Sequence, residues 1–525
     1  MNKLIIVIGF FLLCATNLLA QYTFDWMQGA GNYSKTSVMS TVDSEDNLIV
    51  TGYWQNYQIF TRKYDISGNL LWEVADASGI SGKYEKSNWI NIDADNNILV
   101  VGNIYSYSSS TGWDYPSDIV ALKYSPSGAL LWKTILPISI TITSINRFNT
   151  RSVVDSSGNL YIGTAINAPD GAVLYKIDPS GNLLFTSSSL ENLPRNFSAI
   201  RIKDNRIVMG TSSPTFNVAP VFVYDTSGVL LWTAAAVGYS ASDVEIDENY
   251  NVYVLSSLEN AVSPTSGADM RITKYNAAGT LLWNQDYDFG GIEFSSKLVY
   301  LNNRLSAIGY GPSSPSASYF DWKTIQTDTD GNLLWHAIYD ATTYNDEEPY
   351  YILVKPTGEV IVTGKGGPSP DPNNPSFIQM SIVEYSNTGD QIWIDLPNIY
   401  GGWGLATMFA SDGSLYAISS SDMTVYHYNG IPLGLTNNLF DLDSVKIYPN
   451  PVTTSTTLEL NMKTSKNVEI TVRDLLGKAV INIPEQDFQP GLRKINLDFS
   501  GLNSGLYFCH IKSDENLQTV KLIKY

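Results

Sequence analysis

The sequence predicts an all-β protein: an eight-bladed β-propeller, with seven blades as the fallback, followed by a small Ig-like β-sandwich. Three observations support this prediction. A short phrase ending in Leu-Leu-Trp returns at regular intervals, the chain is rich in Tyr, Thr, Ser and Val, and turn-forming residues separate short alternating segments.

The repeated phrase marks the period of the fold. It ends 47 to 60 residues apart, at Trp72, Trp132, Phe185, Trp232, Trp283, Trp335 and Trp393. A period of about 50 residues is typical of propellers, in which each repeat supplies one four-stranded blade. Each repeat here contains two hairpins, the first like "VVDSSGNLYIGT" (153–164) and the second like "IVALKYSPSGALLW" (119–132).

The ends of the chain complete the ring in this prediction. The sequence holds eight first hairpins but only seven complete second hairpins, since the last repeat stops at "TVYHYNG" (424–430). The segment "YTFDWMQGAG" (22–31) carries Trp26 in the place of the repeated Trp. We therefore expect this N-terminal strand to pair with the last repeat, which leaves no exposed sheet edge.

The hairpin turns share one chemistry. An Asp, Asn or Ser side chain can accept a backbone N–H, and a glycine with positive φ closes the loop. The second hairpins place this glycine at Gly68, Gly128, Gly181, Gly228, Gly279, Gly331 and Gly389. The stretches "DADNN", "DENYN" and "DTDGN" resemble calcium loops, but they lack the bidentate Glu and stand where tight turns are needed. We interpret them as turns and expect no metal site.

The Leu-Leu-Trp strand is expected to be buried on both faces. A blade lies between two neighbours, and a strand buried on both faces has a continuous apolar run. The Trp would fill the wide outer gap between blades.

The long connections of the repeats all fall on one face of the predicted ring, which we call the long-loop face. It comprises the links between the second and third strands of each repeat and between successive repeats. Aromatic rings gather there beside carboxylates such as those of "DEEPYY" (346–351), an arrangement that suits a sugar or a protein partner. Trp89 falls in such a link, and the predicted ligand contacts are Trp54, Tyr57, Trp113, Tyr115, Trp322, Tyr344 and Trp403. The alternative is that these rings pack the loop bases against the blades.

Catalytic chemistry has little support in the sequence. The three histidines, His336, His427 and His510, have no nearby nucleophile and no zinc spacing, and we expect structural roles for them. Glu347 and Glu348 are adjacent, and neighbours on a chain rarely converge as an acid–base pair. A net charge of −19 argues against nucleic acid. No cofactor is expected. A polysaccharide lyase or hydrolase and a structural spacer without a ligand stay as alternatives.

Residues 1–20 have the pattern of a secretory signal peptide: Lys3, an apolar core, and Ala20 before the cleavage point. Cleavage there would remove Cys14. The mature chain would then keep only Cys509, so that no intramolecular disulfide could form.

The composition changes after residue 430, where the propeller (21–430) is expected to end. Residues 431–444 are a predicted linker, and residues 445–525 alternate as short strands typical of a small sandwich. This module contains "IYPNP" (447–451), "VRDLLGK" (472–478), "GLNSGLYF" (501–508) and "KLIKY" (521–525).

On these motifs the module resembles the type A C-terminal sorting domain of the type IX secretion system of Bacteroidetes. The residues that carry the resemblance are Tyr448, Pro449, Asn450, Pro451, Gly477, Gly505, Tyr507, Lys521 and Lys524. The resemblance implies export across both membranes, the secretion machinery and its sortase as partners, and release or attachment at the outer-membrane surface.

The front domain is similar to secreted bacterial propellers with repeats of the form "D-x-x-G-N-x-Y-V-x-G … K-Y-x-x-x-G-x-x-L-W". Quinoprotein dehydrogenases share "G-x-L-L-W", but the propeller here has no Cys pair and no evident cofactor constellation. The sequence therefore favours a monomeric, exported binding protein that holds a glycan or a protein on its long-loop face.

Overall fold

The computed structural model describes most of the chain. The described residues are 22–29, 35–54, 58–77, 79, 82–108, 113–137, 150–166, 171–188, 196–212, 218–237, 240–259, 268–290, 292–312, 319–341, 346–367, 379–397, 403–420, 423–430, 442–448, 452–462, 465–474, 478–489, 491–503, 505–513 and 516–524. The predicted signal peptide and nearly all of the predicted linker lie outside them. Within these residues all regular structure is β-strand, and no helix could cross a bilayer.

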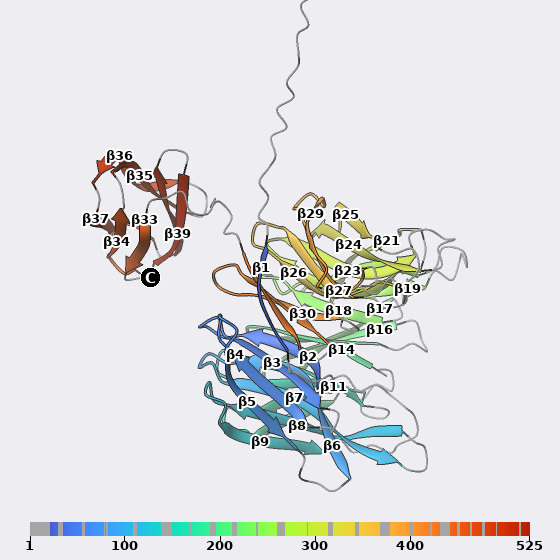
Figure 1. Cartoon of the computed structure of the whole chain (residues 1–525). Coiled ribbons are helices and arrows are strands. Elements are labelled where there is room, and N and C mark those ends of the chain that lie inside the picture. Colours follow the sequence, from blue (N-terminus) through green and yellow to red (C-terminus); the bar gives the residue numbers. More distant parts are fainter. Residues whose placement is uncertain are drawn as a thin grey trace, which may run out of the picture. The chain divides into compact units, whose positions relative to one another are not determined.

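The chain divides into two compact units. One spans Tyr22–Asn429, and the other contains Gly430–Tyr525 (Figure 1). The first unit has 32 described strands in antiparallel sheets. Six of these sheets are four-stranded: β2 (Lys35–Val42) to β3 (Leu48–Trp54), β4 (Ile59–Tyr64) and β5 (Leu70–Asp76); β6 (Lys83–Ile92), β7 (Ile98–Ser108), β8 (Trp113–Tyr124) and β9 (Leu130–Pro137); β10 (Arg151–Val154), β11 (Leu160–Ile166), β12 (Gly171–Ile177) and β13 (Leu183–Ser188); β22 (Phe294–Leu301), β23 (Arg304–Pro312), β24 (Phe320–Asp328) and β25 (Leu333–Tyr339); β26 (Glu348–Val354), β27 (Val360–Lys365), β28 (Met380–Tyr385) and β29 (Gln391–Asp395); and β30 (Gly404–Phe409), β31 (Leu415–Ser419), β32 (Val425–Asn429) and β1 (Thr23–Gln28).

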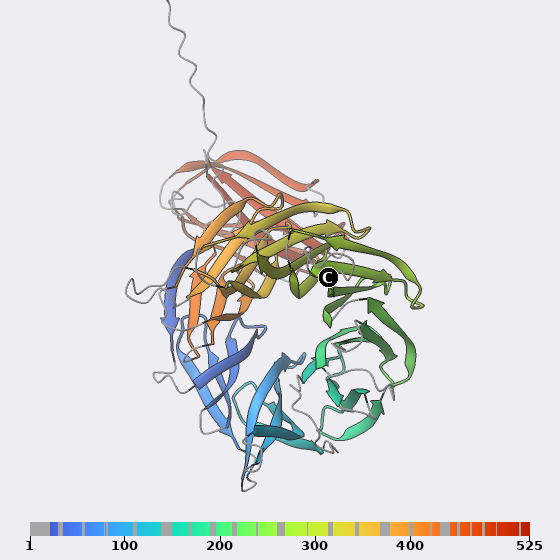
Figure 2. The same cartoon turned by 90° about the vertical axis from the view of Figure 1, so that its right-hand side faces the viewer.

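The remaining eight strands form one larger sheet. They are β14 (Asn196–Lys203), β15 (Arg206–Ser212), β16 (Val218–Asp225), β17 (Leu230–Val237), β18 (Ser240–Ile246), β19 (Val252–Glu259), β20 (Ala268–Tyr275) and β21 (Leu281–Tyr287). A single residue pair, Ser212 with Ser240, joins β15 to β18. We interpret this sheet as two blades that touch at one pair, which gives eight blades around a central axis (Figure 2).

The expected closure of the ring is confirmed. β1 pairs with β32, from Thr23 opposite Asn429 to Gln28 opposite Val425. The first strand of the propeller therefore becomes the outer strand of the last sheet, where blue meets orange in Figure 2. Trp26 stacks on His427, with the ring centroids 5.2 Å apart.

The predicted turn chemistry is also confirmed. In the turn at Asp93, the carboxylate accepts backbone N–H groups from Asp95 and Asn97, and both of its oxygens accept from the side-chain amide nitrogen of Asn97. The turns at Asp247 and Asp328 repeat the backbone pattern. Burial opposes the charge of both carboxylates, but the pKa of each lies below the usual range. For Asp93 the first cause is the Lys123 ammonium at 2.9 Å, followed by the hydrogen bonds from Asn97, and for Asp328 the cause is the hydrogen bonds of the turn.

The repeated glycine and the repeated aromatic ring belong to one contact between neighbouring blades. All seven predicted glycines have φ between +81° and +90°. A Cβ on Gly279 would lie 2.7 Å from the Trp232 ring of the preceding blade. The indole N–H also donates to a carbonyl oxygen in the neighbouring turn; the pairs are Trp26–Ile66, Trp72–Pro126, Trp132–Pro179, Trp232–Ala277 and Trp283–Thr329, at 2.9–3.3 Å. Phe185 fills the same place on Gly228 without the hydrogen bond.

The expectation for the Leu-Leu part of the phrase is wrong. The leucine pairs are exposed by 39–53% in six outer strands, for example Leu70 and Leu71 in β5. An outer strand pairs with a neighbour on one edge only, and the blades diverge there. Of the three residues, only the aromatic ring contacts the turn of the following blade. The continuous burial lies instead in middle strands such as β4, where all six residues are buried although three of them, Thr61, Arg62 and Lys63, are polar or charged.

The second unit has two sheets. β33 (Leu442–Tyr448) and β37 (Gly491–Asp498) flank β34 (Ser455–Met462), and the other sheet has the order β36 (Ala479–Phe488), β35 (Lys466–Asp474), β38 (Gly505–Ser513) and β39 (Asn516–Lys524). Residues from both sheets, including Leu458, Leu460, Ile470 and Cys509, form one buried core. This is the expected small sandwich.

Candidate functional site

The innermost strand of each blade begins at the long-loop face, because it follows a link between repeats. Seven of these strands (β2, β6, β14, β18, β22, β26 and β30) carry a register shift on their pairing with the second strand, and β10 begins at Arg151. A bulge breaks the alternation of a strand and re-aims side chains. Consecutive residues can therefore line one space, as Asn88 and Trp89 do, and also Tyr350 and Tyr351.

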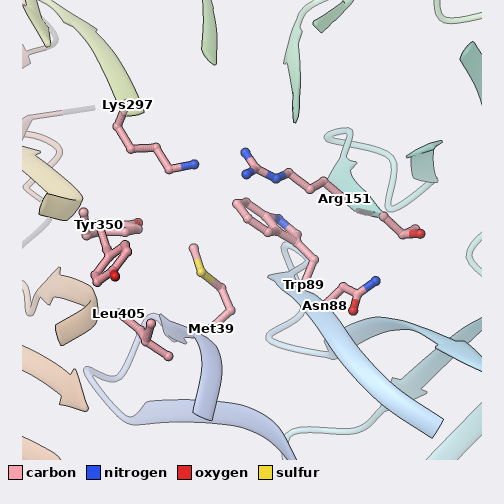
Figure 3. A pocket seen from close by; sticks show the side chains of 9 residues that line it. Met39, Asn88, Trp89, Arg151, Lys297, Tyr350 and Leu405 are labelled. Atoms are coloured by element: carbon pink, nitrogen blue, oxygen red, sulfur yellow. The ribbon is translucent and has the colours of Figure 1, made fainter. Parts of the chain in front are cut away.

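A cavity of about 260 Å³ lies among these strands (Figure 3). Its lining is Met39, Asn88, Trp89, Thr150, Arg151, Lys297, Tyr350, Tyr351 and Leu405. A second cavity of about 170 Å³ shares Met39, Trp89, Lys297 and Tyr351 and adds Arg201, Asp243, Leu298, Val299 and Ile352. Together the two linings draw on all eight innermost strands, so the space is the centre of the ring.

Arg151 extends over the indole ring of Trp89, with its guanidinium carbon 5.1 Å from the ring centroid (Figure 3). Such a cation–π contact holds a guanidinium in place without neutralising it. Nη1 of Arg151 is buried and has no hydrogen-bond partner within the described part of the chain. Burial lowers the pKa of Arg151 to about 10, so the group stays charged at neutral pH.

Lys297 extends from the facing strand toward Arg151 (Figure 3). No carboxylate among the described residues forms an ion pair with Lys297. Burial, followed by the repulsion from Arg151, lowers the pKa of the lysine to about 7. The ammonium group is therefore close to losing its charge at neutral pH.

Arg201 is already paired. Its guanidinium bonds Asp243 at 3.0 Å and Glu245 at 2.9 Å. These carboxylates raise the pKa of Arg201 above the usual range although burial opposes its charge. Burial raises the pKa of Glu245 to about 7, and Asp243, held by Arg201 against burial, has a lowered pKa. The centre of the ring thus carries three basic and two acidic groups, an excess of one positive charge.

One predicted ligand contact reaches this site. Trp403 is 44% exposed and stacks on Tyr350, with centroids 6.2 Å apart and planes at 27°. Tyr350 lines the cavity. The Lys365 ammonium nitrogen lies over the Trp403 ring, 5.9 Å from its centroid. Trp403, Tyr350 and the cavity therefore form one continuous path.

The position of Trp322 contradicts the prediction that this residue contacts a ligand. Its side chain is fully buried in β24, packs on Tyr339 at 4.8 Å, and donates its N–H to the Lys365 carbonyl. It offers no surface to a ligand. The side chains of Trp54, Trp113 and Tyr115, and all of Tyr57 and Tyr344, lie outside the described residues.

Glu347 and Glu348 do not point to one centre. Glu347 is fully buried and accepts the backbone N–H of Ala341 at 3.1 Å. Glu348 accepts the hydroxyl of Tyr350 at 2.9 Å and lies 3.4 Å from Lys365. Both carboxylates therefore fix the start of the inner strand β26 through these contacts.

A metal-compatible group of carboxylates lies apart from the cavity lining. Oxygens of Asp269, Asp288 and Glu293 come within 4.8 Å of one another. Burial, with repulsion from Asp288, raises the pKa of Asp269 to about 6. The group could hold a divalent cation, and Asp269 and Glu293 are buried. Burial lowers the pKa of the nearby Lys323, while Asp321 and then Glu293 oppose that shift.

The motif residues of the C-terminal unit are only partly described. Tyr448 is exposed and donates its hydroxyl to Glu459 at 2.6 Å, and Tyr507 is buried and donates to the Asn503 carbonyl at 2.8 Å. Gly505 and Lys524 pair across β38 and β39, and Lys521 lies in β39. Pro449, Asn450, Pro451 and Gly477 lie outside the described residues.

Solved structures show the class of the first unit. The structure titled "Structure of Dos1 propeller" matches with a TM-score of 0.50 and 10% identity, covering 78% of this chain and 95% of that one. Hydrazine synthase of Kuenenia stuttgartiensis matches at 0.42, 13% identity, 66% and 94%, and the periplasmic gluconolactonase PpgL of Pseudomonas aeruginosa at 0.39, 14%, 68% and 98%. The likeness to the first shows the fold alone: this unit is a β-propeller.

The family of the second unit is shown by sequence. Residues 446–525 match the model described as "Secretion system C-terminal sorting domain". The chain therefore carries a type IX sorting domain at its C-terminus, and the protein is exported cargo that is secreted or attached to the cell surface. No curated protein matches the sequence.

The sequence does not predict these cavity-lining residues as one site. The position of Trp89 between repeats predicts that it lies on the long-loop face, whereas its side chain lines the central cavity. Arg151, Arg201 and Lys297 lie on the inner strands of different repeats, just before or within the first hairpins. A signal existed, because basic residues are scarce in this acidic chain, with 32 against 51 acidic ones, yet three converge here.

Proposed function

We propose that the propeller of this exported protein is a binding module that holds a glycan or a protein through its long-loop face. The observation that carries the proposal is the exposed ring of Trp403, which continues through Tyr350 into the central cavity. Exposed aromatic rings beside a concave polar space are typical of binding sites. One chain supplies all eight inner strands, so a monomer is sufficient.

The test is a glycan array together with a pull-down from surface extracts, both with the mature full-length protein. Trp403→Ala should weaken binding by about tenfold or more, as expected for an aromatic residue near the centre of a contact. Phe24→Ala is the matched control, since Phe24 is 57% exposed but lies on the outer strand β1. Equal binding by both variants, or no ligand in either assay, would count against the proposal and favour the spacer.

We also propose that a sortase of the secretion system removes the C-terminal module after export. The match over residues 446–525 supports a transport signal, which the mature binding module does not need. Intact-mass measurement of the surface or culture-medium form tests this. A product that still contains residue 525 would contradict the removal.

A further inference from the structure

We propose that the central cavity binds the carboxylate of a sugar acid between Arg151 and Lys297. This inference rests on the proposed binding function and names the chemical class of its ligand. The supporting features are the two cations that form no ion pair with a carboxylate among the described residues, the charge excess of the site, and the size of the cavity.

The geometry of the cations selects an anion. Arg151 and Lys297 enter the same cavity from facing blades, and both lack an ion pair within the described residues (Figure 3). The buried Nη1 of Arg151 is an unsatisfied donor. A buried donor without an acceptor is unfavourable, and an anionic oxygen would satisfy it with a charge-assisted hydrogen bond.

The count of charges favours a single negative charge. Asp243 and Glu245 already neutralise Arg201 and add one negative charge more, which leaves an excess of one positive charge among the five groups. A carboxylate would balance this excess. A phosphate dianion would reverse it in a site where desolvated charge is costly.

The remaining walls are mixed in polarity. Tyr351 lines both cavities beside the cations, whereas the side chains of Asn88 and Thr150 already donate hydrogen bonds to Asn103. The volume of about 260 Å³ is below the range of about 300–1,000 Å³ for drug-sized ligands, so the occupant is limited to a small molecule such as a single sugar unit. The flat face of Trp89 that meets Arg151 is already used for the cation–π contact. Its role is to position the guanidinium, and the exposed Trp403 is left to stack on further sugar units.

The protonation states of the neighbours act in one direction. Lys297 is faced by Arg151 on β10, Arg201 on β14, Asp243 and Glu245 on β18, and Tyr351 on β26. As the pH falls through about 7, Lys297 gains its charge and Glu245 begins to lose its own. Both changes make the cavity more positive, so anion binding should strengthen toward lower pH.

The experiment is titration calorimetry on the mature full-length protein at pH 6.5. The probes are D-glucuronate, D-glucose, N-acetyl-L-glutamate, inorganic phosphate and sulfate. Glucuronate should bind with one site per chain, and glucose should bind at least about tenfold more weakly, because it offers no anion to the buried donors. Equal binding of glucose and glucuronate to the unmodified protein would overturn the proposal without any variant.

Variants then locate the site. Arg151→Gln and Lys297→Gln should each weaken glucuronate binding by about ten- to a hundredfold. Lys203→Gln is the matched control, since Lys203 ends the inner strand β14, pairs with the exposed Glu248, and should leave binding unchanged. Unchanged affinity in both cavity variants would also overturn the assignment.

The other probes separate the sources of an anion. Preferred binding of phosphate or sulfate would refute the carboxylate, and preferred binding of N-acetyl-L-glutamate would refute the sugar acid in favour of an acidic peptide. If glucuronate fails while Trp403-dependent glycan binding persists, only this inference falls. If no glycan or protein binds at all, the proposed function falls with it.

Discussion

The contact between the repeated glycine and the repeated Trp predicts that one added methyl group, as in Gly279→Ala, strongly lowers the free energy of unfolding. The part of this loss that comes from the contact can be separated from the part that comes from backbone strain. Gly279 has φ +82°, and an added Cβ would meet the Trp232 ring at 2.7 Å. Gly413 has φ +86° in a turn with the same pair of backbone hydrogen bonds, but a Cβ there meets nothing within 4 Å. The two glycines therefore share the backbone strain and differ in the contact.

The expected free energies follow from these two geometries. Gly413→Ala should lower the free energy of unfolding by about 1–2 kcal/mol, the strain of a left-handed residue with a side chain. Gly279→Ala should add about 1–3 kcal/mol of overpacking, because the indole is fixed by its hydrogen bond to Ala277 and cannot retreat freely. The total for Gly279→Ala is thus about 2–5 kcal/mol.

Urea denaturation of the mature protein, followed by Trp fluorescence, measures both variants. A double-mutant cycle with Trp232→Ala isolates the contact: without the ring, the cost of Gly279→Ala should fall to that of Gly413→Ala. If the two glycine variants shift the urea midpoint equally in the presence of Trp232, the indole ring does not restrict the side chain at position 279. The reasoning from the contact between blades would then be refuted.

Further predictions follow from the ring, the cavity and the C-terminal unit. Glucuronate affinity should fall as the pH rises from 6 to 8 and fall less in Lys297→Arg, which keeps its charge; identical calorimetric profiles would contradict the role of the lysine. Trp26→Ala should destabilise the propeller by about 3 kcal/mol in urea and Phe24→Ala by less, because only the first ring packs between blades; the reverse order would contradict closure by β1. A chain that ends at residue 445 should accumulate inside the cell envelope and not in the medium, as immunoblots of cell fractions would show. Cys509, whose pKa burial raises to about 12, should resist a thiol reagent until the sandwich unfolds, and rapid labelling of the native protein would show otherwise.

The architecture could be predicted because the same turn and strand pattern recurs in each repeat of the sequence. A turn needs an Asp, Asn or Ser at its start and a glycine with positive φ, and both are visible in every copy of the phrase. The closure followed from a count of hairpins, since the strand missing at one end was present at the other. The exposure of Leu70 and Leu71 could not be obtained in this way, because periodicity shows that a strand is apolar but not which neighbour covers it.

The partner of each repeated Trp was also hidden in the sequence. Gly128 and Trp132 stand in the same phrase, yet Gly128 contacts Trp72 of the preceding blade and Trp132 contacts Gly181 of the following one. The Gly and the Trp of one copy of the phrase therefore belong to two different contacts, one with each neighbouring blade. Only the arrangement of blades around the axis shows which halves meet.

The cavity escaped prediction for the opposite reason: its residues are those in which the repeats differ. The innermost strands place one residue after each bulge at the same height, and in four blades this residue is Trp89, Asp243, Lys297 and Tyr351. A residue that recurs in every blade supports the ring, since each blade meets the same neighbours. A position that keeps its geometry but changes its side chain from blade to blade builds an asymmetric centre, which a ligand with one charged end requires. In this propeller, the candidate functional residues occupy a structural position that recurs from blade to blade, and they are found in the blades where the residue type at that position differs.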